Sequence, residues 1–149
     1  MFLFLNLHKS FKEKKIKIEF DNLKTDLYIK ANELLLDLFE NILTNAAKYN
    51  ENLNVYILIA FSNFRSKNEE FIKMEFKDNG IGIPDNRKEL VFQRKSKRNK
   101  RIKGMGMGLS LVKEIVDRFN GQIWVEDNVK GDYKKGSNFV VLILKTEKP

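Results

Sequence analysis

Apolar residues recur along the chain with two different periods, which predict a mixture of helices and strands. From Glu33 to Lys48, seven apolar residues fall on one broad face of a helix. A second amphipathic helix is predicted after Gly108 and is expected to end at Asn120-Gly121. Residues 3–11 show the same helical spacing near the start of the chain.

Strands are predicted where apolar residues alternate or form short β-branched and aromatic runs. The run at 54–61 is too β-branched for a surface helix, and a polar turn over 62–70 is expected to join it to an antiparallel partner. The expected strands cover residues 15–20, 27–31, 54–61, 71–78, 122–127 and 137–145. Residues 79–103 are expected to be loop-rich, with one short helix starting near Asp85 or Asn86. Because strict βαβ alternation is missing, the expected fold is a two-layer α/β sandwich, with helices packed on one face of a mixed β-sheet.

Composition narrows the class of protein. The length of 149 residues and the hydrophobic content of 42% suit one domain with its own core. The chain has no cysteine and one histidine, so disulfides and thiolate chemistry are excluded. No apolar stretch approaches the roughly 20 residues of a membrane span, so we expect a cytoplasmic domain without direct membrane contact. The formal charge of +8 raises nucleic acid, an acidic membrane or a phosphorylated ligand as partners, and the total charge alone does not choose among them.

Two amides occupy an unexpected part of the first helix. At about 100° per residue, Asn41 and Asn45 fall at the edge of its apolar face, and the next turn adds Lys48 and Tyr49. A lone core-facing amide is usually satisfied by neighbouring backbone. Together, however, these side chains offer hard oxygen ligands, a cation and a ring, which a polyphosphate, its magnesium and a base require.

The string DNGIGIP, residues 78–84, directly follows a predicted strand. In isolation it predicts a tight turn. Its functional interpretation is that Asp78, at the strand end, accepts a hydrogen bond from an exocyclic amine, while the flanking glycines let the backbone approach a ligand.

The string GMGMG, residues 104–108, opens the second helix. Its alternate glycines leave unpaired backbone N–H groups at the positive end of the helix dipole, where phosphate binds well. The spacing does not fit a dinucleotide-binding fingerprint, and it lacks the lysine followed by serine or threonine of a Walker loop.

In this order the three motifs resemble the asparagine box and the two glycine boxes of the catalytic ATP-binding domain of sensor histidine kinases. The resemblance covers roughly residues 20–144 and extends to the superfamily of gyrase, heat-shock chaperone and mismatch-repair ATPases. It implies a Bergerat-type sandwich over 20–149 after an N-terminal segment over 1–19, with a mobile ATP lid at about 80–107. It also implies ATP and Mg²⁺ as ligands, a histidine acceptor on a separate dimerisation domain, and a response regulator as partner. The parent protein would be soluble or membrane-anchored.

The resemblance assigns roles to residues at matching positions. Asn45 would coordinate magnesium, Asn41 would support the metal and the phosphates, and Lys48 would contact phosphate. Asp78 would accept a hydrogen bond from the adenine amino group. The other matches would line the pocket, flank the purine or form the lid hinge: Tyr49, Gly80, Gly82, Ile83, Gly104, Gly106, Gly108, Leu109 and Ser137.

The position four residues before Asn45 separates two kinds of activity. Hydrolysing members of the superfamily carry a glutamate there as general base, whereas this chain has Asn41. The neighbouring Glu40 points off the face that carries Asn45. The resemblance therefore favours transfer of the γ-phosphate to a histidine over rapid hydrolysis, with the protein positioning the phosphate and stabilising its charge.

The chain departs from the family pattern at three places. His8 is followed by Lys9 rather than by an acid, and we do not expect it to accept phosphate. Lys95 stands where relatives often have a second lid phenylalanine, three residues after Phe92, and Asn32 stands where they commonly have an aspartate. These differences leave an alternative open, a regulatory or degenerate nucleotide-binding module without transfer activity.

Seven cations gather between Arg94 and Lys103. Subtracting seven from +8 leaves +1, so the rest of the chain is nearly balanced. Such a run is usually a solvated loop, and it could also bind nucleic acid. It contains no interleaved aromatic residue to stack bases, and its position between the glycine boxes favours the ATP lid. We therefore expect a single nucleotide, and no nucleic acid, as the ligand.

Overall fold

The computed structural model describes residues 7–21, 26–94 and 107–148. Its sheet has five strands in the order β1-β2-β3-β5-β4. Their bounds are β1 Lys15–Phe20, β2 Asn54–Ser66, β3 Glu69–Asp78, β4 Gln122–Val129 and β5 Asp132–Leu144. β1 runs parallel to β2 and the other neighbouring pairs are antiparallel, so the sheet is mixed, as predicted.

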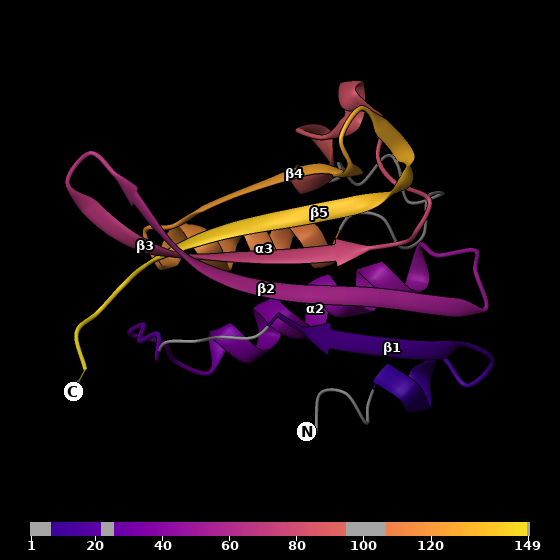
Figure 1. The fold of residues 1–149 in the computed structure, drawn as a ribbon, viewed down its shortest axis with the longest axis horizontal. Coiled ribbons are helices and arrows are strands. Elements are labelled where there is room, and N and C mark those ends of the chain that lie inside the picture. Colours follow the sequence, from indigo (N-terminus) through magenta and orange to yellow (C-terminus); the bar gives the residue numbers. More distant parts are fainter. Residues whose placement is uncertain (1–6, 22–25, 95–106, 149) are drawn as a thin grey trace.

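Two helices, α2 (Leu34–Lys48) and α3 (Met107–Arg118), lie on the same face of the sheet (Figure 1). The apolar stripe of each helix meets the strand residues whose side chains point to that face, and this contact removes apolar surface from water. The side chains buried between the two layers include Leu38, Ile42, Leu43, Ile57, Ile59, Met74, Phe76, Val112, Ile115, Val116, Phe139, Val141 and Ile143. The predicted two-layer α/β sandwich is therefore confirmed.

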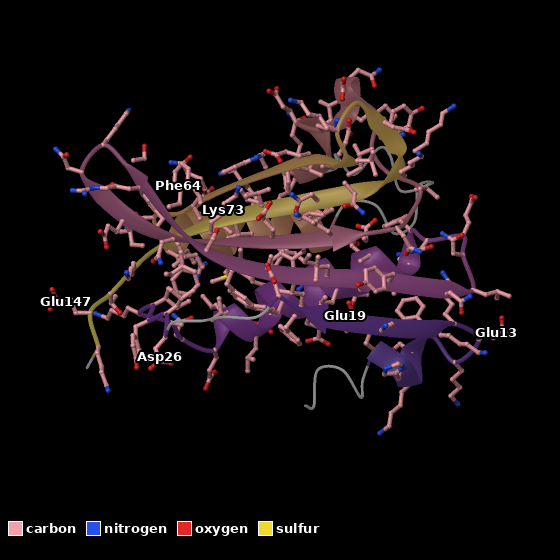
Figure 2. All side chains as sticks on the ribbon, in the orientation of Figure 1. Glu13, Glu19, Asp26, Phe64, Lys73 and Glu147 are labelled. Atoms are coloured by element: carbon pink, nitrogen blue, oxygen red, sulfur yellow. The ribbon has the colours of Figure 1, made fainter. Side chains whose placement is uncertain are left out.

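The opposite face of the sheet carries no helix within the described ranges and is largely charged. Figure 2 shows Glu19 and Lys73 on this face, and Lys73 Nζ lies 3.7 Å from Glu75 Oε1. Val140 and Leu142 lie on the same face, because they are the direct partners of Glu75 and Lys73 in the β3–β5 register. Both are nevertheless buried. Long polar side chains thus shield the apolar centre of this face.

The β2–β3 hairpin extends farther than predicted. Its turn is confined to Lys67 and Asn68, whose φ angles of 47° and 68° suit a two-residue turn between twisted strands. The segment 62–70, predicted as a turn, is otherwise strand. β5 pairs with β3 only from Phe71 onward, and consecutive residues of the outer hairpin, 62–65 and 67–70, are exposed, so both of its faces meet water. An apolar alternation is therefore missing from its sequence.

The segments before α2 and after β3 also differ from the prediction. Residues 27–31 do not form a strand, because only Ile29 reaches the sheet, in an isolated bridge with Lys145. In place of one short helix after β3 there are two 3-10 helices, η1 Asp85–Arg87 and η2 Leu90–Phe92.

The N-terminal segment is attached to the end of α2. Residues 7–10 form one helical turn, and Leu7 is buried. Lys14 Nζ donates a hydrogen bond of 2.7 Å to the carbonyl of Ala47 and a second one to the carbonyl of Asn50. The expected domain boundary between residues 19 and 20 falls inside β1, whose six residues all pair with β2.

Candidate functional site

A pocket opens between the end of α2, the segment after β3 and the first turn of α3. The space between its walls, which is open to solvent at the mouth, amounts to about 530 Å³. The residues that line it are Asn45, Ala46, Tyr49, Asp78, Ile81, Gly82, Ile83, Val91, Leu109, Ser137 and Phe139. Mostly apolar walls with a few polar groups are typical of a site that encloses a flat ring and fixes its orientation.

Asp78 is the buried acid of this pocket, and 6% of its surface is exposed. Its Oδ1 accepts hydrogen bonds from the backbone N–H groups of Gly80, at 2.8 Å, and Ser137, at 3.2 Å. Burial raises the pKa of the carboxyl from 3.8 to about 6, although the two hydrogen bonds act in the opposite direction. The group is therefore mostly ionised at neutral pH, with Oδ2 as the acceptor that remains for a ligand.

Three glycines allow the backbone to close around Asp78. A Cβ on Gly82 would lie 1.6 Å from the carbonyl oxygen of Tyr133, and a Cβ on Gly136 would lie 1.9 Å from that of Asp78. Both glycines have positive φ, 72° and 111°. A Cβ on Gly80 would lie 2.7 Å from the carbonyl oxygen of Tyr49, the residue that directly follows α2. Gly136, which no sequence motif indicated, thus has the same steric role as the two predicted glycines.

Asn79 connects the floor of the pocket to the segment that follows α2. Its Oδ1 accepts hydrogen bonds from Asn50 Nδ2, at 2.7 Å, and from the N–H of Tyr56, at 2.8 Å. Its Nδ2 donates to the carbonyl of Asn54 at 3.1 Å. Asn50 is only 2% exposed, whereas Asn54 and Tyr56 are exposed, so the network runs from the interior to the surface. The DNG string is therefore more than a tight turn, since its amide holds two segments together.

Replacing Asn79 by alanine should destabilise the fold. The substitution removes three hydrogen bonds and leaves the buried amide of Asn50 without its acceptor, so we expect the free energy of unfolding to fall by about 3 kcal/mol. Urea denaturation measures this change, with Asn63→Ala, an exposed hairpin asparagine, as the matched control. Equal stability of the two variants would show that the network contributes little.

Asn41 and Asn45 face the beginning of α3. A Cβ on Gly108 would lie 3.2 Å from Asn41 Oδ1 and 3.8 Å from Asn45 Oδ1. Asn41 Nδ2 donates to the carbonyl of Asp37 at 2.7 Å, which leaves its Oδ1 directed toward α3. Two amide oxygens therefore lie beside a helix N-terminus, whose backbone N–H groups and dipole attract anions.

The donor set beside α3 suits a magnesium ion that shares the phosphates of a nucleotide. Across the described ranges, no three His, Cys, Asp or Glu side chains are grouped so that they could hold a metal by themselves. Amide oxygens are hard donors, and Mg²⁺ commonly takes few protein ligands and completes its octahedron with water and phosphate. Asn41 and Asn45 therefore fit such an ion.

Lys48 and Tyr49 end α2 at the edge of the pocket. Tyr49 is half-buried, and burial raises the pKa of its hydroxyl. Lys48 is exposed, with its Nζ 5.5 Å from the centre of the Tyr49 ring. Since lysine carries its charge on a flexible four-carbon stem, the ammonium can reach an anion at the pocket mouth by rotation of the side chain.

Most of the predicted site residues come together at this pocket. Those that line it are Asn45, Tyr49, Asp78, Gly82, Ile83, Leu109 and Ser137. Those that adjoin it through the contacts above are Asn41, Lys48, Gly80 and Gly108. Gly104 and Gly106, together with Lys95, lie outside the described residues.

Four lining residues were not predicted: Ala46, Ile81, Val91 and Phe139. The ring of Phe139 packs edge-on against that of Phe92, with 6.1 Å between the ring centres. Ala46, Val91 and Phe139 are buried apolar residues like any core residue, whereas Ile81 is an exposed apolar residue inside the DNGIGIP string. A wall of a pocket and a wall of a core have the same sequence pattern.

Comparison with known proteins gives a family and a set of relatives. The family model "Histidine kinase-, DNA gyrase B-, and HSP90-like ATPase" matches residues 31–148. The sensor histidine kinase WalK of Bacillus subtilis (strain 168) is 33% identical over 111 residues, which cover 71% of this chain and 18% of WalK. The chain thus spans less than a fifth of the length of that relative.

Solved structures share the fold. The mycobacterial sensor histidine kinase MprB matches with a TM-score of 0.76 and 19% identity, covering 98% of this chain and 93% of that one. Full-length ShkA in complex with AMPPNP matches with a TM-score of 0.73 and 20% identity, covering 99% of this chain and 30% of that one. The mixed sheet with helices on one face is therefore an arrangement found in histidine kinases.

Proposed function

The chain belongs to the histidine kinase-, DNA gyrase B- and HSP90-like ATPase family, and on this premise we propose that its pocket binds Mg-ATP for phosphoryl transfer. The γ-phosphate would pass to a histidine on a separate dimerisation domain and from there to a response regulator. The observation that carries the proposal is the ionised, buried carboxylate of Asp78 at one end of an apolar pocket, with the amide oxygens of Asn41 and Asn45 at the other.

The two ends of the pocket match the two ends of ATP. At the buried end, Asp78 accepts a hydrogen bond from the adenine amino group, while Ser137 lies beside it. The apolar side chains of Ile83 and Leu109, with the ring of Tyr49, enclose the purine. This arrangement buries the flat base and leaves the triphosphate at the pocket mouth, where charge can be neutralised.

At the mouth, Asn45 would coordinate magnesium, and Asn41 would support the metal and the phosphates. Magnesium held there would supply positive charge that offsets the charge developing on the phosphates. Lys48 and the N-terminus of α3 at Gly108 would add positive potential to the same region. Gly104 and Gly106 stay predicted phosphate-binding positions of the lid hinge.

Transfer is favoured over hydrolysis by the residues near the phosphates. Asn41 stands where a general base would be needed, and its amide does not accept a proton from water near neutral pH. Glu40 is exposed to solvent rather than turned toward α3. The contribution of this domain would be to position the γ-phosphate and to stabilise its charge while a histidine attacks.

We propose a cytoplasmic location for this domain, because ATP is available there. Within the described residues, no helix combines the length and the apolar character that crossing a bilayer requires. We propose no direct membrane contact for this domain, and the parent protein would be soluble or membrane-anchored.

Calorimetric titration with a non-hydrolysable ATP analogue, with and without magnesium, tests the binding proposal. We expect saturable binding that is at least about tenfold tighter with magnesium, because the metal relieves phosphate repulsion at the site. Asn45→Ala should remove most of this magnesium increment, whereas the exposed control Asn63→Ala should keep it. No saturable binding by the wild type would contradict the proposal.

Labelled ATP and a histidine-bearing dimerisation domain test the transfer step. Label on the histidine supports a kinase domain. Tight ATP binding without any label would instead favour the second candidate, a regulatory or degenerate nucleotide-binding module, which Lys95 at the second lid-phenylalanine position also suggests.

A further inference from the structure

The pairing of β4 with β5 is interrupted next to the pocket. The register runs to Asp127 opposite Ser137 and resumes with Val129 opposite Asp132. The single residue Asn128 therefore faces the segment 133–136 of β5, which bulges out of the ladder. Bulges beside functional sites commonly redirect a side chain toward the site. We call Asp127, Asn128 and residues 133–136 the β4–β5 bulge.

The bulge holds the backbone of Asp78. Asn128 Nδ2 donates a hydrogen bond of 2.8 Å to the main-chain carbonyl of Asp78. The β3–β5 ladder ends at Lys77, so this amide acts as the partner that β5 no longer supplies. Gly136 packs against the same carbonyl, and the next N–H, of Ser137, binds the carboxylate. Both the backbone and the side chain of Asp78 are thus fixed by one short stretch.

The bulge also anchors the opposite wall of the pocket. Asp127 Oδ1 accepts a hydrogen bond of 2.6 Å from Lys88 Nζ, and the side chains are only 14% and 18% exposed. Lys88 directly follows η1 and lies three residues before Val91, a lining residue. The ion pair therefore ties the segment that carries Val91 to β4.

We propose that the β4–β5 bulge positions both walls of the base pocket and sets its preference for adenine. Asn128 is a positioning residue for Asp78, and Asp127 acts through Lys88 on the wall at Val91. Neither Asp127 nor Asn128 belongs to the residues that line the pocket. The inference rests on the proposed binding of ATP. It names two residues outside the three motifs: Asn128, which determines base selectivity through Asp78, and Asp127, which supports the wall at Val91.

A comparison of ATP with ITP distinguishes positioning from general support of the fold. ITP carries a carbonyl oxygen in place of the amine and therefore cannot make the hydrogen bond from the amine to Asp78. We expect Asn128→Ala to weaken ATP binding by about five- to tenfold, because the hydrogen bond from the adenine amine to the charged carboxylate of Asp78 is misaligned. ITP does not make this bond, so its binding should weaken by less than about twofold. Lys88→Met should instead weaken both nucleotides about equally, since it displaces an apolar wall. Asn63→Ala serves as the unaffected control.

The outcomes separate this inference from the proposed function. If the wild type binds neither nucleotide, the proposed function itself fails. If the wild type prefers ATP but Asn128→Ala leaves the ATP-to-ITP affinity ratio unchanged, only the positioning role is overturned. A wild type without any preference for ATP also overturns it. Should Asn128→Ala fold poorly, Asn128→Asp keeps the size of the side chain, removes the donor, and is expected to lower the same ratio.

Discussion

Asp78→Asn should abolish adenine-nucleotide binding without lowering the thermal stability of the free protein. The new Oδ1 still accepts the N–H groups of Gly80 and Ser137, so the loop keeps its support. On the ligand side, an N–H group replaces the acceptor and meets the adenine amine donor to donor. A buried polar mismatch of this kind lowers affinity by at least about 100-fold.

The stability of the same variant follows from the burial of the wild-type carboxyl. The shift of its pKa from 3.8 to about 6 corresponds to about 3 kcal/mol spent on keeping the charge buried at neutral pH. A neutral amide avoids that cost, so the melting temperature of Asp78→Asn at pH 7 should equal or exceed that of the wild type. The exposed Asp26→Asn serves as control for both measurements. Binding within about threefold of the wild type would contradict the role of Asp78 in base recognition.

The raised pKa also fixes the sign of the pH dependence. An acid whose pKa is raised in the folded state contributes stability at low pH, and this contribution is lost as pH rises from 3.8 through about 6. ATP binding needs the ionised carboxylate and should run the opposite way, weakening as pH falls below about 6. The carboxyl ¹³C shift of Asp78 should titrate with a midpoint near pH 6 in the free protein. With nucleotide bound, the midpoint should move to lower pH.

Gly82→Ala should be far more damaging than Gly131→Ala, although both glycines have similar positive φ angles, 72° and 82°. A Cβ at Gly131 meets nothing within 4 Å, so the variant has only the conformational cost of roughly 1–2 kcal/mol. At Gly82 the new atom would lie 1.6 Å from the Tyr133 carbonyl oxygen, which only a backbone displacement relieves. We expect at least about 3 kcal/mol of further destabilisation there, a large part of a typical domain's stability.

Urea denaturation of the two glycine variants gives the comparison directly. If Gly82→Ala and Gly131→Ala lose the same stability, the contact between the DNGIG loop and β5 is looser than the geometry indicates. If Gly82→Ala stays folded but no longer binds nucleotide, the displacement is taken up by the loop and not by the whole domain.

The helices and the type of sheet were predictable because burial on one side imposes a period on the sequence. α2 follows its apolar stripe from Leu34 to Lys48, and α3 ends where Asn120 adopts a positive φ before a glycine. The outer hairpin was not predictable, since strand residues that face water on both sides need no alternation. Residues 27–31 have an apolar alternation, yet only Ile29 pairs, because the segment meets just the end of β5.

The polar part of the site was predictable from chemistry, whereas its supports were not. Asp78 and Asn45 are polar residues at positions where a core would require apolar ones, and this conflict marks them. Phe139 follows strand periodicity like any core residue, so nothing distinguishes a pocket wall. Asn128 resembles a turn asparagine in sequence, and its contact with a carbonyl 50 residues away depends on a bulge that only the fold creates.

The seam between β3 and β5 joins two locally closed hairpins, β2–β3 and β4–β5. It pairs Phe71 with Leu144, the longest-range strand contact in the described sheet, and longer loops cost more entropy to close. Asp78 lies on one side of this seam, and its donors Asn128 and Ser137 lie on the other. A nucleotide seated on Asp78 would bind only when the seam is closed, so its binding free energy adds to that of the pairing. The ligand would therefore stabilise the pairing between the β2–β3 hairpin and the β4–β5 hairpin, neither of which contains a complete site.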